Sequence, residues 1–153
     1  MRGLSACRND NENLKMKATL VEVLSADPDI MAAYLFGSHA RGAQSLLSDV
    51  DVAVLLQEQS DQDNFHKRLT LLGELMGELR FDRVDLIILN ESPPALTYRI
   101  IKEGILLFER PDAGRERIRF EKDSFMAYFD LQKLHEAVAG EMRKRIKEGR
   151  FGG

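Results

Sequence analysis

Two apolar segments of strand length constrain the fold of this chain most strongly, because polar residues stand at fixed places beside them. The first, residues 30–36, leads into Gly37-Ser38, and the second, residues 49–56, contains two aspartates one residue apart, Asp49 and Asp51. Side chains alternate between the two faces of a strand, so these carboxylates are expected to point the same way. Paired carboxylates repel each other unless a cation lies between them, and their oxygens suit Mg²⁺. The pattern predicts a metal-dependent site for phosphoryl or nucleotidyl transfer.

The composition is that of one ordinary globular domain. The chain has 153 residues, of which 44% are hydrophobic and 31% charged, and its formal net charge of -3 argues against a surface that coats nucleic acid. The single cysteine, Cys7, cannot form an internal disulfide, which is typical of a reducing compartment. No apolar run is long enough to span a bilayer, and the N-terminal segment contains no apolar signal core. We therefore expect a cytoplasmic protein without a membrane partner.

Helical and strand-like segments alternate along the sequence. Apolar residues at helical spacing, including Leu14, Val21 and Leu24, predict a helix from about residue 11 to residue 25. The other predicted elements are strands over 30–36, 49–56, 83–89 and 105–108, a helix that begins within 60–63, and a helix between 93 and 104. The helix that begins within 60–63 is expected to bury one apolar stripe: Phe65, Leu69, Leu72, Met76 and Leu79. This order indicates an α/β or α+β layer fold with a small sheet.

The C-terminal segment predicts a helix over about 115–148, which is longer than a small α/β core needs. Its apolar positions lie roughly along one side: Phe125, Tyr128, Leu131, Leu134, Val138, Met142 and Ile146. A stripe of this kind suits the contact of a helix with a groove on another protein. We therefore expect residues 111–153 to form a helical extension that binds a partner.

A third acid, Asp85, stands near the start of the predicted strand over 83–89. If this strand neighbours the one that carries Asp49 and Asp51, the three carboxylates gather at one edge of the sheet. Three acids can hold two Mg²⁺ ions, which clamp the attacking and leaving oxygens of an in-line displacement. Asp85 could also accept the proton of the nucleophile. In isolation, an ordinary surface acid is the simpler interpretation of this residue.

The connection after the first strand suits phosphate. Glycine at position 37 lets the backbone approach a ligand closely, and exposed N–H groups with the hydroxyl of Ser38 suit phosphate oxygens. Arg41 could neutralise a triphosphate through bidentate contacts. Alone, a Gly-Ser pair is equally compatible with a plain turn. No Gly-Lys-Ser/Thr follows at the spacing of a Walker loop, so that class of phosphate site is excluded.

Taken together, these residues resemble a known signature. Gly37-Ser38, ten intervening residues and then Asp49-Val50-Asp51 look like the motif of the DNA polymerase β-like nucleotidyltransferase superfamily. The run through Arg41-Gly42 and the later stretch over 98–108 are similar to its minimal nucleotidyltransferase (MNT) branch. The resemblance implies a nucleotidyltransferase fold with a small mixed sheet over 12–110, preceded by a flexible tail over 1–11. It also implies transfer of a nucleoside monophosphate from a triphosphate, ATP by default, with two Mg²⁺ ions.

The resemblance also assigns roles to the candidate residues. Asp49 and Asp51 would bind both metal ions, and Asp85 would complete the catalytic metal site and serve as base. Gly37 and Ser38 would hold the triphosphate, with help from Arg41. One departure from the pattern is Leu46-Leu47, which stands where polar residues, Gly or Pro are usual.

Small MNT proteins of this kind often act as antitoxins that adenylylate a tyrosine of a HEPN-domain RNase toxin. The resemblance therefore implies a HEPN toxin as partner, a homo- or hetero-oligomer, and no direct binding of nucleic acid. Two alternatives stay open at this point: an adenylyltransferase that modifies a small molecule of the aminoglycoside type, and an antitoxin that acts by binding alone.

Overall fold

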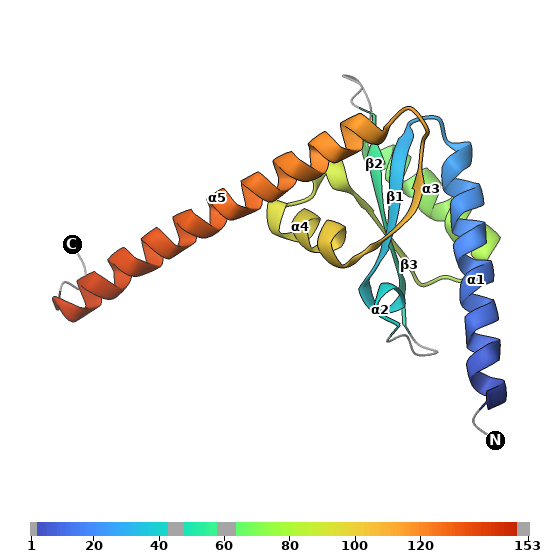
Figure 1. Ribbon diagram of the computed structural model, residues 1–153, viewed down its shortest axis with the longest axis horizontal. Helices are drawn as coiled ribbons and strands as arrows, with labels where there is room; N and C mark the ends of the chain where they lie inside the picture. Colours follow the sequence, from blue (N-terminus) through green and yellow to red (C-terminus); the bar gives the residue numbers. More distant parts are fainter. Residues whose placement is uncertain (1–2, 43–47, 58–63, 150–153) are drawn as a thin grey trace.

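The computed structural model describes residues 3–42, 48–57 and 64–149, with side chains described from residue 11 onward. A four-stranded sheet forms its centre, in the order β3-β2-β1-β4 (Figure 1). The strands are β1 (Ile30–Phe36), β2 (Val50–Leu56), β3 (Val84–Ile88) and β4 (Ile105–Glu109). β2 and β3 run parallel, whereas β1 is antiparallel to both β2 and β4. The protein is therefore a mixed α+β fold with a small mixed sheet, as the sequence predicted.

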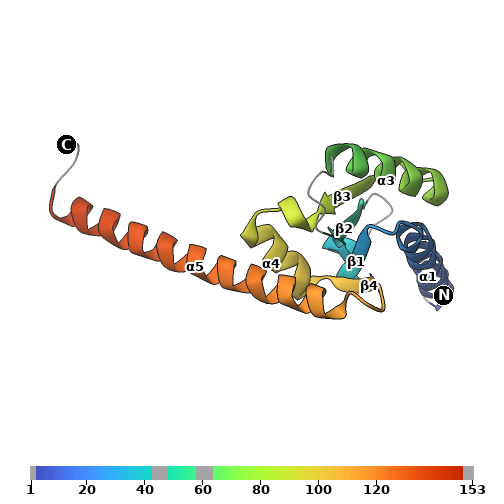
Figure 2. The ribbon, with the colours of Figure 1, turned by 90° about the horizontal axis from the view of Figure 1, so that it is seen from above.

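Helices cover both faces of the sheet (Figure 2). The helices α1 (Gly3–Ala26) and α3 (Asn64–Leu79) pack on one face, and α4 (Pro94–Glu103) and the first part of α5 (Gly114–Lys147) pack on the other. Two short elements complete the described chain, α2 (Gly37–Ala40) and the 3-10 turn η1 (Leu89–Glu91). No described helix is long and apolar enough to cross a membrane.

Strand β2 is buried on both faces, which explains why its sequence is a nearly continuous apolar run. Val52 and Val54 belong to the core under α1 and α3, whereas Ala53 and Leu55 belong to the core under α4. All four side chains are at most 1% exposed. The two-sided burial leaves only the start of the strand for a carboxylate, because an unpaired acid further along would lie in an apolar interior.

Two helices differ from the sequence prediction. α1 begins at Gly3 rather than near residue 11, and the predicted start of α3 within 60–63 lies outside the described residues. The predicted stripe on α3 is partly wrong, because Phe65 and Leu69 are 64% and 50% exposed. The residues that α3 fully buries are Leu71 and Leu75. The apolar face of this helix is wide, and periodicity alone does not say which part of such a face meets the sheet.

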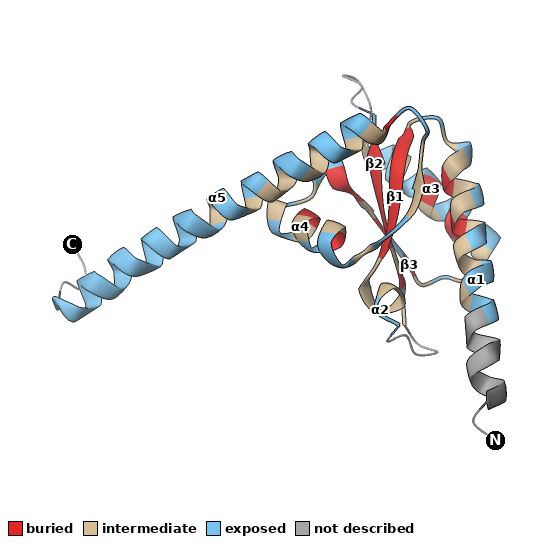
Figure 3. Ribbon diagram, in the orientation of Figure 1, coloured by how far each residue is buried: buried red, intermediate tan, exposed pale blue. Residues whose placement is uncertain are grey.

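The last helix begins against the body of the protein and then extends away from it (Figures 1 and 3). Near its start, Tyr128 stacks on Tyr98 of α4, with ring centroids 4.0 Å apart, and Phe125 and Phe129 meet the ring of Tyr98 edge-on. Every described residue from 132 onward is exposed. The apolar stripe predicted from the sequence is therefore split into a packed first half and a second half that no described residue covers.

A charged network holds the first turns of α5 to the sheet. Arg117 pairs with Glu109 at the end of β4 and with Glu121 on its own helix, and Tyr34 of β1 donates a hydrogen bond to Glu121 over 2.6 Å. Burial, reinforced by the carboxylate of Glu121, raises the pKa of Tyr34, so the hydroxyl stays protonated and remains a donor. The direction in which α5 leaves the body is thus fixed by polar contacts as well as by the aromatic cluster.

Replacing Arg117 with methionine should destabilise the protein by about 2–3 kcal/mol, since two partly buried carboxylates would lose their common cation. The side chain of Arg117 is 17% exposed. Arg119, two residues further along, is 84% exposed and forms a long ion pair with Asp123, at 3.9 Å. The matched variant Arg119→Met should change stability by no more than about 0.5 kcal/mol. Urea unfolding of both variants measures the difference, and equal stabilities would show that the network does not anchor α5.

Candidate active site

The parallel pairing of β2 with β3 brings two of the candidate acids together. Asp51 and Asp85 are direct partners in the register of the two strands, and Phe36 lies opposite Asp51 on the other side, at the end of β1. Asp49 precedes β2 by one residue, where the N–H of Val50 donates to the carbonyl of Arg83 over 2.9 Å. All three acids therefore stand at the edge where β2 and β3 begin, as the sequence predicted for neighbouring strands.

The environment of Asp51 disfavours its negative charge. Burial raises the pKa of this carboxyl, and the neighbouring carboxylates Asp85 and Asp49 raise it further. The neighbouring His39 and Arg41 lower this pKa, but they do not outweigh the other effects. Asp51 is thus a crowded carboxylate, and a cation bound beside it would relieve the repulsion.

Asp85 has a partner that the sequence did not indicate. The Nη2 atom of Arg68 on α3 lies 3.4 Å from its Oδ1 atom, and the Nε of Arg68 donates to the carbonyl of Leu86 over 2.7 Å. The hydrogen bond to Leu86 holds the guanidinium of Arg68 beside β3. Nothing in the local sequence around Arg68 marks it, because its role comes from the packing of α3 against the sheet.

The backbone at Gly37 lies directly on the carboxylate of Asp51. Gly37 has a φ of +70°, and a Cβ atom added there would lie 2.0 Å from Oδ2 of Asp51. Both the conformation and the space require glycine at this position. The predicted phosphate-binding turn and the predicted metal ligand are therefore in contact.

The rest of this turn carries the other candidate groups. Ser38 lies within α2, next to Gly37, and Arg41 follows α2 and forms an exposed ion pair with Glu103 of α4, 3.6 Å from Nη1 to Oε2. The two ring nitrogens of His39 are buried and have no hydrogen-bond partner among the described residues. The departure at Leu46-Leu47 lies outside the described residues.

The carboxylates fit Mg²⁺ by their chemistry, although they are not gathered around one point. Among the described residues, no group of three or more His, Cys, Asp or Glu side chains is close enough to hold a metal ion. Asp85 faces Arg68 instead, while Asp51 remains next to like charges. Carboxylate oxygens are the ligands that Mg²⁺ prefers, so the donor set fits, and Asp49 and Asp51 are the two that form no ion pair within the described part of the chain.

Comparison with known proteins decides the family. The family model described as polymerase beta nucleotidyltransferase matches residues 18–113. The chain belongs to this family. The matched range includes all the candidate site residues and ends where α5 begins, at Gly114.

Individual relatives agree with this assignment. The protein adenylyltransferase MntA of Shewanella oneidensis is 34% identical over 115 residues, which are 75% of this chain and 78% of the relative. A chain in a solved toxin–antitoxin structure with AMP-PNP has a TM-score of 0.67 and 26% identity, covering 83% of this chain and 98% of that one. The MNT antitoxin in complex with tri-AMPylated Shewanella oneidensis HEPN toxin has the same fold, with a TM-score of 0.64 and 23% identity over 86% of this chain and 98% of that one.

Proposed function

We propose that this chain is a protein adenylyltransferase that acts as the antitoxin of a HEPN-domain RNase toxin. It transfers AMP from ATP to a tyrosine of the toxin, and this modification silences the toxin. The 34% identical relative bears the name protein adenylyltransferase, and the 26% identical solved structure is a toxin–antitoxin pair with an ATP analogue. The observation that carries the proposal is the contact of Gly37 with Asp51, whose register partner is Asp85.

The site residues divide the work of the transfer. Asp49 and Asp51 would hold two Mg²⁺ ions, with Asp85 completing one of the two sites, and the bound metal would supply positive charge against the triphosphate. Backbone N–H groups at Gly37 and the hydroxyl of Ser38 hold the phosphates. Arg41 contributes a guanidinium once its exposed ion pair with Glu103 opens.

The chemical step joins the tyrosine oxygen to the α-phosphorus of ATP. The bond from that phosphorus to the bridging oxygen breaks, and diphosphate leaves. The hydroxyl proton passes to Asp85, and its register pairing with Asp51 supports this role for it. Arg68 orients that base through its ion pair.

The exposed half of α5 is the part of the chain best suited to hold the partner. Leu134, Val138 and Met142 are 59%, 51% and 61% exposed and follow one another at a spacing of four residues. The stripe continues the side that packs on α4, so a partner would extend an existing interface. An exposed apolar stripe of this length favours a protein acceptor over a small molecule, because only a protein is large enough to cover it.

Changing Leu134, Val138 and Met142 together to serine should weaken complex formation with the toxin at least about tenfold, since three apolar anchors would be lost. The fold should be unaffected, because none of the three is covered in the described structure. The control carries serine at Lys133, Glu136 and Lys144, which the helical spacing places on the opposite side. Titration calorimetry with the toxin compares the two variants, and equal affinities would exclude this face from the interface.

A further inference from the structure

The outward face of α3 is an apolar surface that no part of the described chain covers. Phe65 and Leu69, one turn apart, are 64% and 50% exposed, although the sequence pattern indicated burial for both. Leu71 and Leu75 hold the helix on the sheet, and Leu69 lies on the side away from them. Figure 2 shows α3 as an outer layer of the molecule, with the sheet on one side and no other element beyond it. Adjacent large apolar side chains in such a place indicate a contact surface for another protein.

Two glycines continue this face along the helix. Leu69, Gly73 and Gly77 follow one another at a spacing of four residues, so they form one exposed row. A Cβ atom added at Gly73 or Gly77 would meet nothing within 4 Å in the described chain. Glycine lowers the stability of a helix relative to alanine, and the packing of the described chain gives no reason for it at either position. A second helix that approaches α3 closely would give that reason, because side chains at the contact set the distance between two packed helices.

The row fits a second copy of itself. If two α3 helices pack antiparallel about a two-fold axis at Gly73, Leu69 of each copy lies opposite Gly77 of the other, because both positions are four residues from the centre. The leucine of one copy then fills the space that the glycine of the other leaves, and Gly73 meets Gly73 where the helices are closest. Parallel packing would place leucine against leucine and leave a gap between the glycines. The order of the three residues therefore favours an antiparallel pair of identical helices.

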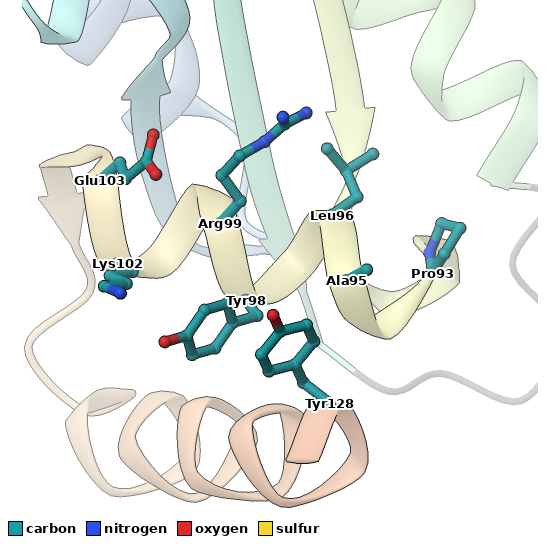
Figure 4. A pocket seen from close by; sticks show the side chains of 8 residues that line it. All are labelled: Pro93, Ala95, Leu96, Tyr98, Arg99, Lys102, Glu103 and Tyr128. Atoms are coloured by element: carbon teal, nitrogen blue, oxygen red, sulfur yellow. The ribbon is translucent and has the colours of Figure 1, made fainter. Parts of the chain in front are cut away.

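A second open surface, the groove along α4, is less suited to such a contact. Its lining combines apolar, aromatic and charged side chains (Figure 4): Leu96, Tyr98, Tyr128, Arg99, Lys102 and Glu103. The row from Leu69 to Gly77 on α3 contains no charged residue, so two copies can meet along it without burying a charge.

We propose that α3 forms the interface of a homodimer, in which two copies pack antiparallel through Leu69, Gly73 and Gly77. The contact leaves the candidate site open, because Arg68 turns towards the sheet and meets Asp85 at 3.4 Å. It also leaves the exposed stripe of α5 free for the toxin, since α3 and α5 pack on opposite faces of the sheet. The dimer does not depend on the proposed adenylyl transfer.

Sedimentation equilibrium of the full-length protein without the toxin tests this interface. Wild type should dimerise with a Kd of about 1–100 µM, because the contact between two single helices is small. Gly77→Gln should weaken the dimer at least about tenfold, since its side chain occupies the space of Leu69 of the other copy. At a concentration where wild type is monomeric, the same variant should melt roughly 1–3 °C higher, because a helical glycine is removed. A role in the fold of the monomer would not combine a higher melting temperature with a weaker dimer.

The chain offers matched controls for both kinds of residue. Gly140 of α5 also has nothing within 4 Å of an added Cβ, so Gly140→Gln should raise the melting temperature and leave the dimer unchanged. Leu69→Gln should weaken the dimer, whereas Leu14→Gln should not, although Leu14 of α1 is 69% exposed. The exchange of Leu69→Gly with Gly77→Leu in one chain keeps the match between two copies. It should restore dimerisation to within about fivefold of wild type.

A wild-type protein that stays monomeric at about 100 µM would overturn the proposal. A dimer that Gly77→Gln leaves unchanged, or that Gly140→Gln weakens equally, would overturn it as well. If wild type is monomeric and Gly77→Gln instead weakens binding of the toxin, the face belongs to the toxin and not to a second copy. AMP transfer by wild type is measured separately, so failure of the dimer leaves the proposed function intact.

Discussion

Asp51→Asn and Asp49→Asn are each expected to reduce AMP transfer to the toxin at least about a thousandfold. Both variants remove a charge that the proposed mechanism needs for Mg²⁺, and asparagine keeps the size of the side chain. Rates of transfer from α-labelled ATP measure the effect. Asp82→Asn, a nearby exposed acid outside the site, should retain the wild-type rate. Full activity in both site variants would exclude these aspartates from the reaction.

The stability of Asp51→Asn separates loss of chemistry from loss of fold. Because burial and the adjacent carboxylates raise the pKa of Asp51, the folded protein holds this proton more tightly than the unfolded chain does. The stability that protonation contributes is present below about pH 4 and is lost as the pH rises through the folded pKa. At neutral pH without Mg²⁺, Asp51→Asn should therefore melt at or above the wild-type temperature.

The expected gain is small, since Asp51 is partly open to solvent: under about 1 kcal/mol, or up to about 4 °C. The difference from wild type should shrink as the pH is lowered towards 4. Adding Mg²⁺ should stabilise wild type and not the variant. If Asp51→Asn melted well below wild type at neutral pH, the charge of Asp51 could not be destabilising, and the repulsion among the three carboxylates would be contradicted.

Gly37→Ala is expected to reduce both nucleotide affinity and the rate of AMP transfer at least about a hundredfold. Its Cβ would lie 2.0 Å from Oδ2 of Asp51, so either the carboxylate or the phosphate turn must move. The positive φ adds about 1–2 kcal/mol of backbone strain. Calorimetry with AMP-PNP and a thermal melt measure the two consequences separately.

Gly42→Ala provides the matched control. Gly42 has nearly the same backbone conformation, with a φ of +66°, but a Cβ there would meet nothing within 4 Å. Gly42→Ala should therefore introduce backbone strain without a steric clash. We expect it to lose about 1 kcal/mol of stability and to keep its affinity for AMP-PNP. Equal loss of affinity in both variants would mean that the contact with Asp51 is not what Gly37 supplies.

The strands and their acids could be predicted from the sequence because both depend on short-range pattern. The run over 30–36 is β1 residue for residue, and the run that contains Asp51 is β2, which begins one residue later than predicted. Asp85 became informative only through its expected place on a neighbouring strand, and the register with Asp51 confirms that place.

What the sequence could not predict depends on packing between distant segments. The buried face of α3 is centred on Leu71 and Leu75, which is decided by how the helix lies on the sheet. Arg68 reaches Asp85 only because of that placement.

The central claim is best tested by incubating the toxin with α-labelled ATP, Mg²⁺ and this protein, followed by mass spectrometry of the toxin. Wild type should place AMP on a toxin tyrosine and abolish RNase activity, whereas Asp51→Asn should do neither at matched concentration. A toxin that is silenced without label, equally by wild type and by Asp51→Asn, would contradict catalysis and show that the chain acts by binding alone.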